Sequence, residues 1–175
     1  GDNSTALVFT FTILAGEADS DGISIGDNAL ALNSGTIMDA AGNIANRTHS
    51  AVSANTSYKV VTSGPSVSSF TLSDTALKAG DNATVTLVFS VAVTSFSSAS
   101  NITVDNGTLT TMTSSDNIIW VGTFTPNINT EDPSSALSLD TNYTDTAGNA
   151  GPAETTLNYE IDTQLPSVSS FYLSD

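Results

Sequence analysis

The chain has 175 residues, a length that allows one large domain or two of modest size. It carries 18 Asp and Glu residues against three Lys and Arg residues, which gives a formal net charge of -15. We expect so acidic a surface to repel nucleic acid and anionic membranes, because phosphate binding needs Lys and Arg to displace counterions. The surplus of carboxylates does suit hard cations, and Ca²⁺ is the first candidate because it prefers several oxygen ligands.

The chain contains no cysteine. This is compatible with an extracellular location, because a sandwich of roughly 100 residues needs no disulfide to complete its core. No run of about 18 apolar residues occurs, so we expect no insertion into a membrane. No basic-then-apolar signal segment opens the chain either, and we therefore expect Gly1 to be the start of a fragment.

The predicted elements, in chain order, are almost all β-strands. The first covers residues 7–13, where Leu, Phe and Ile alternate with Val and Thr. Residues 27–32 give the only hint of a helix, and that stretch is too short to matter. Further alternating runs cover residues 84–89, 120–126 and 156–161, and a proline ends the second of these.

Turn sequences separate these runs at Gly80-Asp-Asn, Asp105-Asn-Gly and Gly148-Asn. About seven short strands in about 100 residues predict a two-sheet β-sandwich with Greek-key connections.

An internal repeat sets the domain organisation. The segment PSVSSFTLSD at residues 65–74 returns as PSVSSFYLSD at residues 166–175, 101 positions later and with one difference in ten. The sequence DAAGN at 39–43 is echoed by DTAGN at 145–149, and we call this five-residue pattern the DxAGN turn. The strand before each proline also recurs, beginning at Tyr58 and Tyr159. We therefore predict the back part of one module at 1–62, a complete module at 63–162, and a linker with the first strand of a third at 163–175.

These motifs resemble tandem bacterial Ig-like domains, which occur in giant secreted adhesins and other repetitive cell-surface proteins. The resemblance rests on LVFTFT, AGEADSDGIS and DAAGN in the first module and on FTP and DTAGN in the second. It covers nearly the whole chain. It implies an extender rod at the bacterial cell surface, often with Ca²⁺ at the joints, and a target bound by other domains.

The first module would lack its first strands, which leaves open sheet edges and half a core. We expect a longer chain to supply them; the alternative is that another copy of the chain does so by strand complementation.

We expect no enzyme activity. His49 is the one histidine, and without cysteine a nucleophilic triad would depend on this loop residue alone. The acidic residues do not cluster with aromatic residues that could bind a sugar, and we expect Trp120 to pack in the core beside Phe124.

The segment Glu17-Ala-Asp19-Ser-Asp21-Gly22 places three carboxylates at alternate positions before a glycine. This resembles the opening of an EF-hand loop, although the later bidentate acid is missing because Asn28 stands twelve positions along. We predict a looser Ca²⁺ loop at Glu17, Asp19 and Asp21; the alternative is an acidic, solvated turn.

The joints between modules are the second candidate for Ca²⁺. At the second joint we expect Asp162 to act with Asp74 and Asp132, together with Glu131, in loops at the exit end. At the first joint Val61 stands in the position of Asp162, so a site there would need Asp145 and Asn149 beside the Glu17–Asp21 loop. The alternative for the DxAGN turn is structural: Gly148 supplies a positive φ and Asp145 caps the turn.

The predicted role is therefore a rod segment stiffened by Ca²⁺, whose partners are neighbouring modules of the same chain. The first alternative is a filament or sheath subunit that makes strand contacts with other copies. The second is a module that binds a glycan or protein through loops 94–101 and 113–118, where Phe96 is the aromatic residue.

Overall fold

The computed structural model describes residues 6–175, which form two compact units, one ending at Ser63 and the other beginning at Gly64. The regular elements of both units are strands, and among the described residues the single helix is the four-residue α1 (Ser98–Asn101). The all-β prediction is therefore confirmed. No helix in residues 6–175 has the length and apolar character that would span a membrane.

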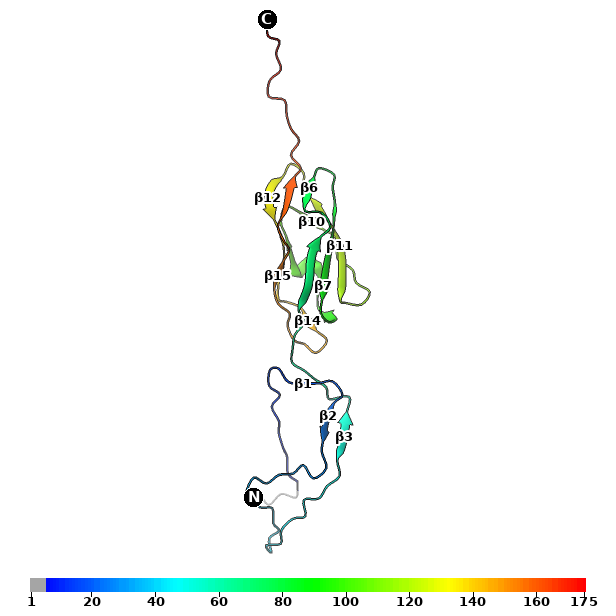
Figure 1. The fold of residues 1–175 in the computed structure, drawn as a ribbon, viewed down its shortest axis with the longest axis vertical. Helices are drawn as coiled ribbons and strands as arrows, with labels where there is room; N and C mark the ends of the chain where they lie inside the picture. Colours follow the sequence, from blue (N-terminus) through cyan, green and yellow to red (C-terminus); the bar gives the residue numbers. More distant parts are fainter. Residues whose placement is uncertain (1–5) are drawn as a thin grey trace. The chain divides into compact units, whose positions relative to one another are not determined.

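The unit that begins at Gly64 is a sandwich of short strands (Figure 1). They are β5 (Val67–Leu72), β6 (Ala76–Lys78), β7 (Ala83–Phe89), β8 (Val93–Thr94), β9 (Ile102–Val104), β10 (Gly107–Leu109), β11 (Ile119–Pro126), β12 (Glu131–Ser135), β13 (Leu137–Leu139), β14 (Thr144–Asp145), β15 (Glu154–Thr155) and β16 (Tyr159–Asp162). The largest sheet has the order β10-β11-β7-β5, with neighbouring strands antiparallel. Two three-stranded sheets, β12-β16-β6 and β15-β13-β9, and the pair β14-β8 complete the unit.

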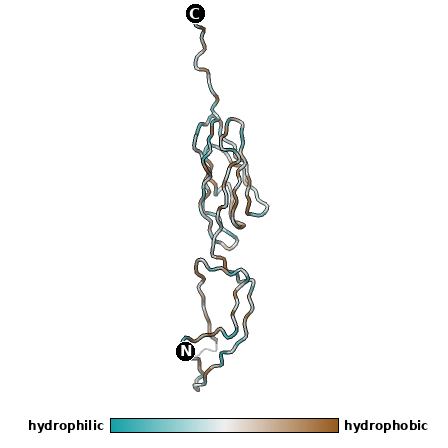
Figure 2. Tube along the Cα trace, viewed as in Figure 1, coloured by the Kyte–Doolittle hydropathy of each residue, from teal (hydrophilic) through white to brown (hydrophobic). Residues whose placement is uncertain are grey.

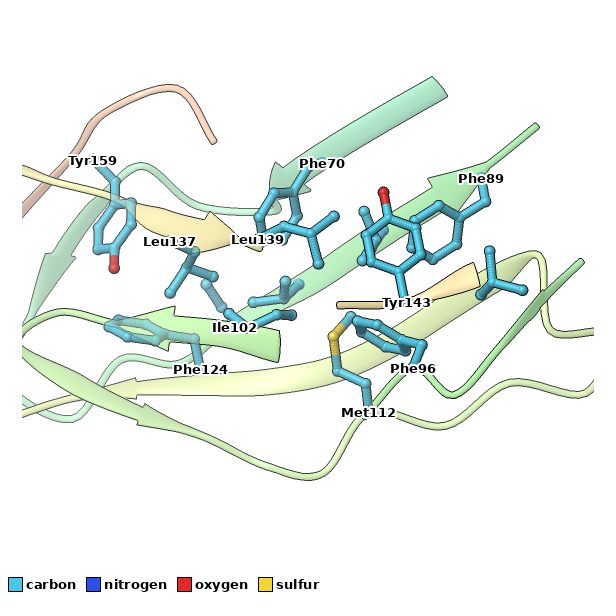
Figure 3. Packing of buried hydrophobic residues seen from close by; sticks show 14 of the residues in the cluster. Phe70, Phe89, Phe96, Ile102, Met112, Phe124, Leu137, Leu139, Tyr143 and Tyr159 are labelled. Atoms are coloured by element: carbon cyan, nitrogen blue, oxygen red, sulfur yellow. The ribbon is translucent and has the colours of Figure 1, made fainter. Parts of the chain in front are cut away.

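The core lies where the inward faces of these strands meet (Figure 3). On β7 the residues Val85, Leu87 and Phe89 are at most 1% exposed, and Thr86 and Val88 occupy the positions between them. The alternation predicted for this strand is thus confirmed, since successive side chains of a strand point to opposite faces. Phe124 of β11 contacts Tyr159 of β16 edge to face, at 5.2 Å between ring centroids, and so links the sheets.

A second aromatic group occupies the end of the core near α1. Phe96 stacks edge-on against Phe89 at 5.7 Å and against Trp120 at 4.8 Å, while Phe89 also meets Tyr143 at 5.0 Å. Trp120 packs against the buried cluster, as predicted. Its indole nitrogen is buried and has no hydrogen-bond partner in the structure.

The structure corrects the prediction for the last strand. The run 156–161 was expected to be one alternating strand, but Leu157 is 85% exposed and lies outside the strands, whereas Tyr159 and Ile161 are buried. The chain instead pairs β15 with β13 and then β16 with β12 and β6, so it changes partner between Thr155 and Tyr159. Breaks of this kind explain why there are more strand segments than the seven expected.

The unit that ends at Ser63 contains β1 (Ala18–Asp19), β2 (Ile23–Ile25), β3 (Val52–Asn55) and β4 (Val60–Val61). β1 pairs with β4 and β2 pairs with β3, both antiparallel. Among residues 6–63 only Gly22 is buried. Hydrophobic residues recur along this part of the trace (Figure 2), yet they enclose no core.

The strand predicted at residues 7–13 is not formed. Leu7, Phe9 and Phe11 are more than half exposed. A strand needs neighbours for its backbone N–H and C=O groups, and within the described residues this run has none. Residues 163–175 likewise form neither helix nor strand.

Candidate functional site: the acidic turns and the exit end of the sandwich

The DxAGN turn of the second unit is held by the carboxylate of Asp145, which is only 4% exposed. Its Oδ1 accepts hydrogen bonds from the backbone N–H groups of Ala147 (2.8 Å) and Asn149 (2.9 Å). Its Oδ2 accepts one from Nδ2 of Asn149 (3.0 Å). Gly148 adopts φ +91°, a conformation that glycine reaches without strain. The predicted structural role of this motif is confirmed.

The first unit builds the same turn from Asp39. Oδ1 of Asp39 accepts from the backbone N–H groups of Ala41 (3.0 Å) and Asn43 (2.8 Å), and Oδ2 accepts from Nδ2 of Asn43 (2.8 Å). Gly42 has φ +90°. The repeated sequence thus encodes one closed loop, with the Asp as acceptor, the Asn as donor and the Gly as the reversing residue.

These hydrogen bonds set the charge state of both aspartates. Burial alone would raise the pKa of Asp145, but the hydrogen bonds from the side chain and backbone of Asn149 outweigh burial and hold that pKa below its usual value. The side chain and then the backbone of Asn43 lower the pKa of Asp39 in the same way. Both turns therefore carry a carboxylate that is ionised at neutral pH and has its hydrogen bonds satisfied within the turn.

The acidic segment 17–22 contains β1 and the tight turn that joins β1 to β2. Oδ1 of Asp19 accepts from the backbone N–H groups of Asp21 (3.2 Å) and Gly22 (2.7 Å), and Oε2 of Glu17 accepts from the N–H of Leu14 (2.7 Å). Gly22 has φ +104°, and a Cβ there would lie 2.1 Å from the carbonyl oxygen of Asn55. This is the predicted acidic turn between strands, and the Ca²⁺ assignment to these residues stays a prediction.

The exit end of the sandwich, where β16 finishes, carries a row of charges. Asp162 pairs in register with Glu131 of β12 on one side and with Lys78 of β6 on the other. All three residues are exposed, and directly opposed residues share a face of the sheet. Like charges in that arrangement repel, so the contact between Glu131 and Asp162 favours any cation that reaches it.

The protein's own cation at this end is Lys78. Its Nζ lies 3.1 Å from Oδ2 and 3.3 Å from Oδ1 of Asp81. The backbone N–H of Lys78 and then its ammonium group lower the pKa of Asp81. Sequence reasoning missed this pair, although the Lys78-x-x-Asp81 spacing around Gly80 could have revealed it, because a turn brings residues i and i+3 together.

Asp132 and Asp74 occupy other places than the exit-side loops that were expected. Asp132 lies within β12 and accepts hydrogen bonds from Asn106, Ser134 and Ser135, which lower its pKa despite partial burial. Asp74 lies where the chain crosses from β5 to β6, four residues before Lys78, and its Oδ1 accepts from the N–H of Ala76 (3.0 Å). Asp132 pairs in register with Ile161, one position from Asp162, and the Ca²⁺ assignment to Asp74, Asp132 and Asp162 stays a prediction.

Within residues 6–175 no group of three His, Asp or Glu side chains gathers closely enough to hold a metal ion. Among these residues, therefore, no three of the predicted carboxylate ligands come together. Oxygens of Asp145, Asp132 and Asp19 already accept two or three hydrogen bonds each. Asp162 is less engaged, with the N–H of Gln164 at 3.2 Å from its Oδ1.

His49, considered for catalysis, and Phe96, considered for glycan or protein binding, make other contacts in the structure. Nδ1 of His49 lies 3.0 Å from the carbonyl oxygen of its neighbour Ser50. Phe96, the aromatic residue of loop 94–101, is 8% exposed and belongs to the core. Loops 94–101 and 113–118 therefore present no exposed aromatic ring.

A model of the family described as bacterial Ig-like domain matches residues 61–161, more than half of the chain. No curated protein and no solved structure matches the chain. No catalytic family matches it.

Proposed function

We propose that this chain, which belongs to the bacterial Ig-like domain family, is an extender segment of a large extracellular bacterial adhesin or surface protein. Domains of this family are typically non-catalytic and are usually found in cell-surface or secreted proteins. Its work is mechanical: each domain adds its own length to the chain and keeps that length under load.

The path of the chain through the complete domain carries this proposal. β5 and β6 run in one direction along the edge of the sandwich, and β16 lies parallel to β6 in the register Asp162 opposite Lys78. The chain thus enters the domain before Val67 and leaves it after Asp162, at the opposite end (Figure 1). A domain whose two ends lie at the same side would add little to the length of the extended chain, whereas this domain adds the length of its long axis.

The same pairing suits a domain under tension. A force applied between the two ends pulls the parallel strands β6 and β16 along their length, so all the hydrogen bonds between them are loaded together. An antiparallel pair pulled from adjacent ends would open one bond at a time. The geometry therefore favours mechanical resistance along the direction in which a surface protein is stretched.

We propose Ca²⁺ as the ion that stiffens the loops and joints of this rod. The support is the net charge of -15 and the outward pair Glu131 and Asp162, two carboxylates opposed on neighbouring strands. This donor set suits a hard cation, although two carboxylates alone do not make a site, and Ca²⁺ takes six to eight oxygens. An ion there would take its remaining ligands from the next module or from water.

The two alternative functions, a binding module and a filament subunit, depend on different features of the chain. A glycan- or protein-binding role would need exposed aromatic side chains in loops 94–101 and 113–118, and the burial of Phe96 removes the one candidate. A filament subunit needs strand contacts between copies of the chain, and that alternative stays a prediction.

A distance measurement tests the extender role. Spin labels on S66C and Q164C should report a single narrow distance, because the eleven steps from Val67 to Lys78 span about 30–36 Å in extended chain. The wild-type chain has no cysteine, so labelling is specific. A distance below about 20 Å would place both ends at one pole and rule out this role.

A further inference from the structure

The turn between β9 and β10 contains the one Asn-Gly pair of the sequence, Asn106-Gly107. We propose that Asn106 is a site of spontaneous deamidation, a reaction that the folded domain suppresses and that unfolding releases. The product cannot rebuild the contacts that the amide makes in the folded domain, so the modification marks a domain that has been unfolded. This inference goes beyond the extender role and does not depend on it.

The reaction consumes one water molecule and needs no enzyme, metal or oxidant. The backbone nitrogen of Gly107 attacks Cγ of Asn106, and a bond forms between these two atoms. The bond from Cγ to Nδ2 breaks, and the amide nitrogen takes the proton of the attacking N–H and leaves as ammonia. Water then opens the five-membered succinimide ring at either carbonyl carbon, which yields aspartate or isoaspartate. Glycine in the second place favours the attack, because no side chain shields its nitrogen.

Both residues of the pair are required by the fold. Asn106 has φ +55°, and asparagine adopts this left-handed conformation more readily than most residues do. A Cβ on Gly107 would overlap the ring of Phe124 and would lie 2.7 Å from the carbonyl oxygen of Thr125. Phe124 is fully buried in the packed core, so its ring cannot easily move aside. The turn therefore keeps the residue pair that is most prone to deamidation.

Asn106 connects the turn to two other strands. Its Nδ2 donates hydrogen bonds to Oδ2 of Asp132 and to Oγ of Ser135 (3.1 Å), both in β12. Its backbone carbonyl oxygen accepts from the N–H of Asn127 (2.9 Å), the residue that follows β11. Ser135 is 2% exposed, so part of this contact is buried. The amide of Asn106 is therefore a donor at a place where three segments of the chain meet.

These contacts slow the reaction while the domain is folded. The attack requires Cγ of Asn106 and the backbone nitrogen of Gly107 to turn toward each other. The two hydrogen bonds from Nδ2 hold the side chain against β12, and Gly107 is fixed in β10 opposite Pro126. Both restraints are lost when the chain unfolds. Deamidation should therefore be slow in the folded domain and fast in the unfolded chain.

The product fits the same place poorly. An aspartate there has no N–H group to donate to Asp132 and Ser135, and it brings a second carboxylate to that of Asp132. Like charges at this distance repel, and the neighbouring Asp105 adds a third negative charge. Isoaspartate also lengthens the backbone by one carbon atom, which disturbs the register of Gly107 opposite Pro126. Two hydrogen bonds are thus replaced by repulsion.

The time that a domain spends unfolded then decides its later stability. A domain that refolds at once keeps the amide and regains its full stability. A domain that is held open, as a segment under tension can be, loses the amide and refolds to a less stable form. Each domain therefore keeps a chemical record of long unfolding.

Other asparagines of the chain serve as internal controls. Asn117 and Asn129 also have positive φ values, +59° and +52°, but a β-branched residue follows each of them. The branched side chain shields the attacking nitrogen, so both residues should keep their amides. Asn33 is exposed in the folded chain and precedes Ser34, so its rate shows what a denaturant alone does to the reaction.

Ageing of the whole chain tests the proposal. The protein is kept at one alkaline pH in buffer and in guanidinium chloride, and peptide mass spectrometry follows the conversion of amide to acid at each asparagine. Asn106 should convert at least about ten-fold faster in guanidinium, because in buffer the reaction needs a rare opening of the fold. In guanidinium it should also convert faster than Asn117 and Asn129, while the rate at Asn33 changes far less. Equal rates at Asn106 in both solutions after correction by Asn33, or no excess over Asn117, would overturn the proposal.

The variant N106D tests the effect of the modification on stability. Its urea midpoint, followed by Trp120 fluorescence, should lie clearly below that of the wild-type chain. N106D/D132N exchanges the amide and the carboxylate between two contacting positions, so it should recover part of the loss, whereas N106D/D105N should recover less. A wild-type midpoint for N106D, or equal recovery in the two double variants, would also overturn the proposal. Neither experiment involves the spacing of S66C and Q164C, so the extender role is judged separately.

Discussion

Substituting Asp145 with alanine should unfold the complete domain far more easily than a change in an exposed turn normally would. The carboxylate is buried and accepts three hydrogen bonds, two of them from backbone N–H groups. A hydrogen bond to a charged group contributes about 1.5–3 kcal/mol. Residues 146–148 are exposed, so water can replace part of what is lost. We expect D145A to lower the free energy of unfolding by about 3 kcal/mol.

Urea denaturation followed by the single tryptophan measures this loss. Trp120 packs against the core of the second unit, so its fluorescence reports that unit alone. D145N is the matched control: it can still accept the two backbone hydrogen bonds but lacks the charge, and it should lose about 1 kcal/mol.

A loss below about 0.5 kcal/mol for D145A would refute the structural account of the turn. The same loss is expected in EGTA, because hydrogen bonds within the turn provide the stabilisation and need no Ca²⁺. A loss that appears only when Ca²⁺ is present would assign Asp145 to a cation site.

Four further results are expected. Burial raises the pKa of Tyr143 and of Tyr159 to about 12 from 10, so the folded state holds these two protons more tightly than the unfolded state does. The free energy of unfolding should therefore be unchanged below pH 10 and should fall by about 2–3 kcal/mol per tyrosine as the pH rises to 12. Urea titrations across that pH range measure this fall. G151A should cost about 2–3 kcal/mol, read in the same assay, because its Cβ would lie 2.2 Å from the ring of Tyr143. L87A should cost about 3–5 kcal/mol, since the side chain is fully buried and leaves a cavity. If Ca²⁺ binds at the exit end, the melting temperature should be higher in 5 mM Ca²⁺ than in EGTA, and D162N should reduce that difference. Equal melting temperatures in Ca²⁺ and EGTA would refute the calcium proposal.

The sequence was a good guide wherever one face of a strand is buried. Alternation at Val85, Leu87 and Phe89 identified β7 and its inner face because a period of two has one physical cause in a half-buried sheet. The DxAGN turn was equally readable. An Asp, a Gly and an Asn at fixed spacing meet the requirements of a closed loop, namely an acceptor, a positive φ and a donor.

The sequence was a poor guide where the formation of a strand depends on which other strand it pairs with. Residues 7–13 alternate as clearly as β7 does but form no strand. Alternation shows which side chains share a face of a strand, but it does not show whether another strand lies alongside to pair with it. Leu157 was misplaced for a related reason: the chain changes from one partner strand to another at that point. Local patterns contain no information about such a change.

The candidate site shows the same limit. Clustering of acids along the sequence could not reveal that Asp132 lies within a strand or that Asp74 lies part-way along an edge. Nor did it reveal the cross-strand row of Glu131, Asp162 and Lys78, which depends on register between three distant segments.

Pulling single molecules in two directions tests the extender role most directly. Handles on S66C and Q164C load β6 and β16 in shear, whereas handles on I128C and Q164C peel β12 from β16 one bond at a time. We expect a clearly higher unfolding force for the first pair than for the second. Equal forces, or a lower force along the axis from Ser66 to Gln164, would contradict the claim that this domain is built to bear tension between its ends.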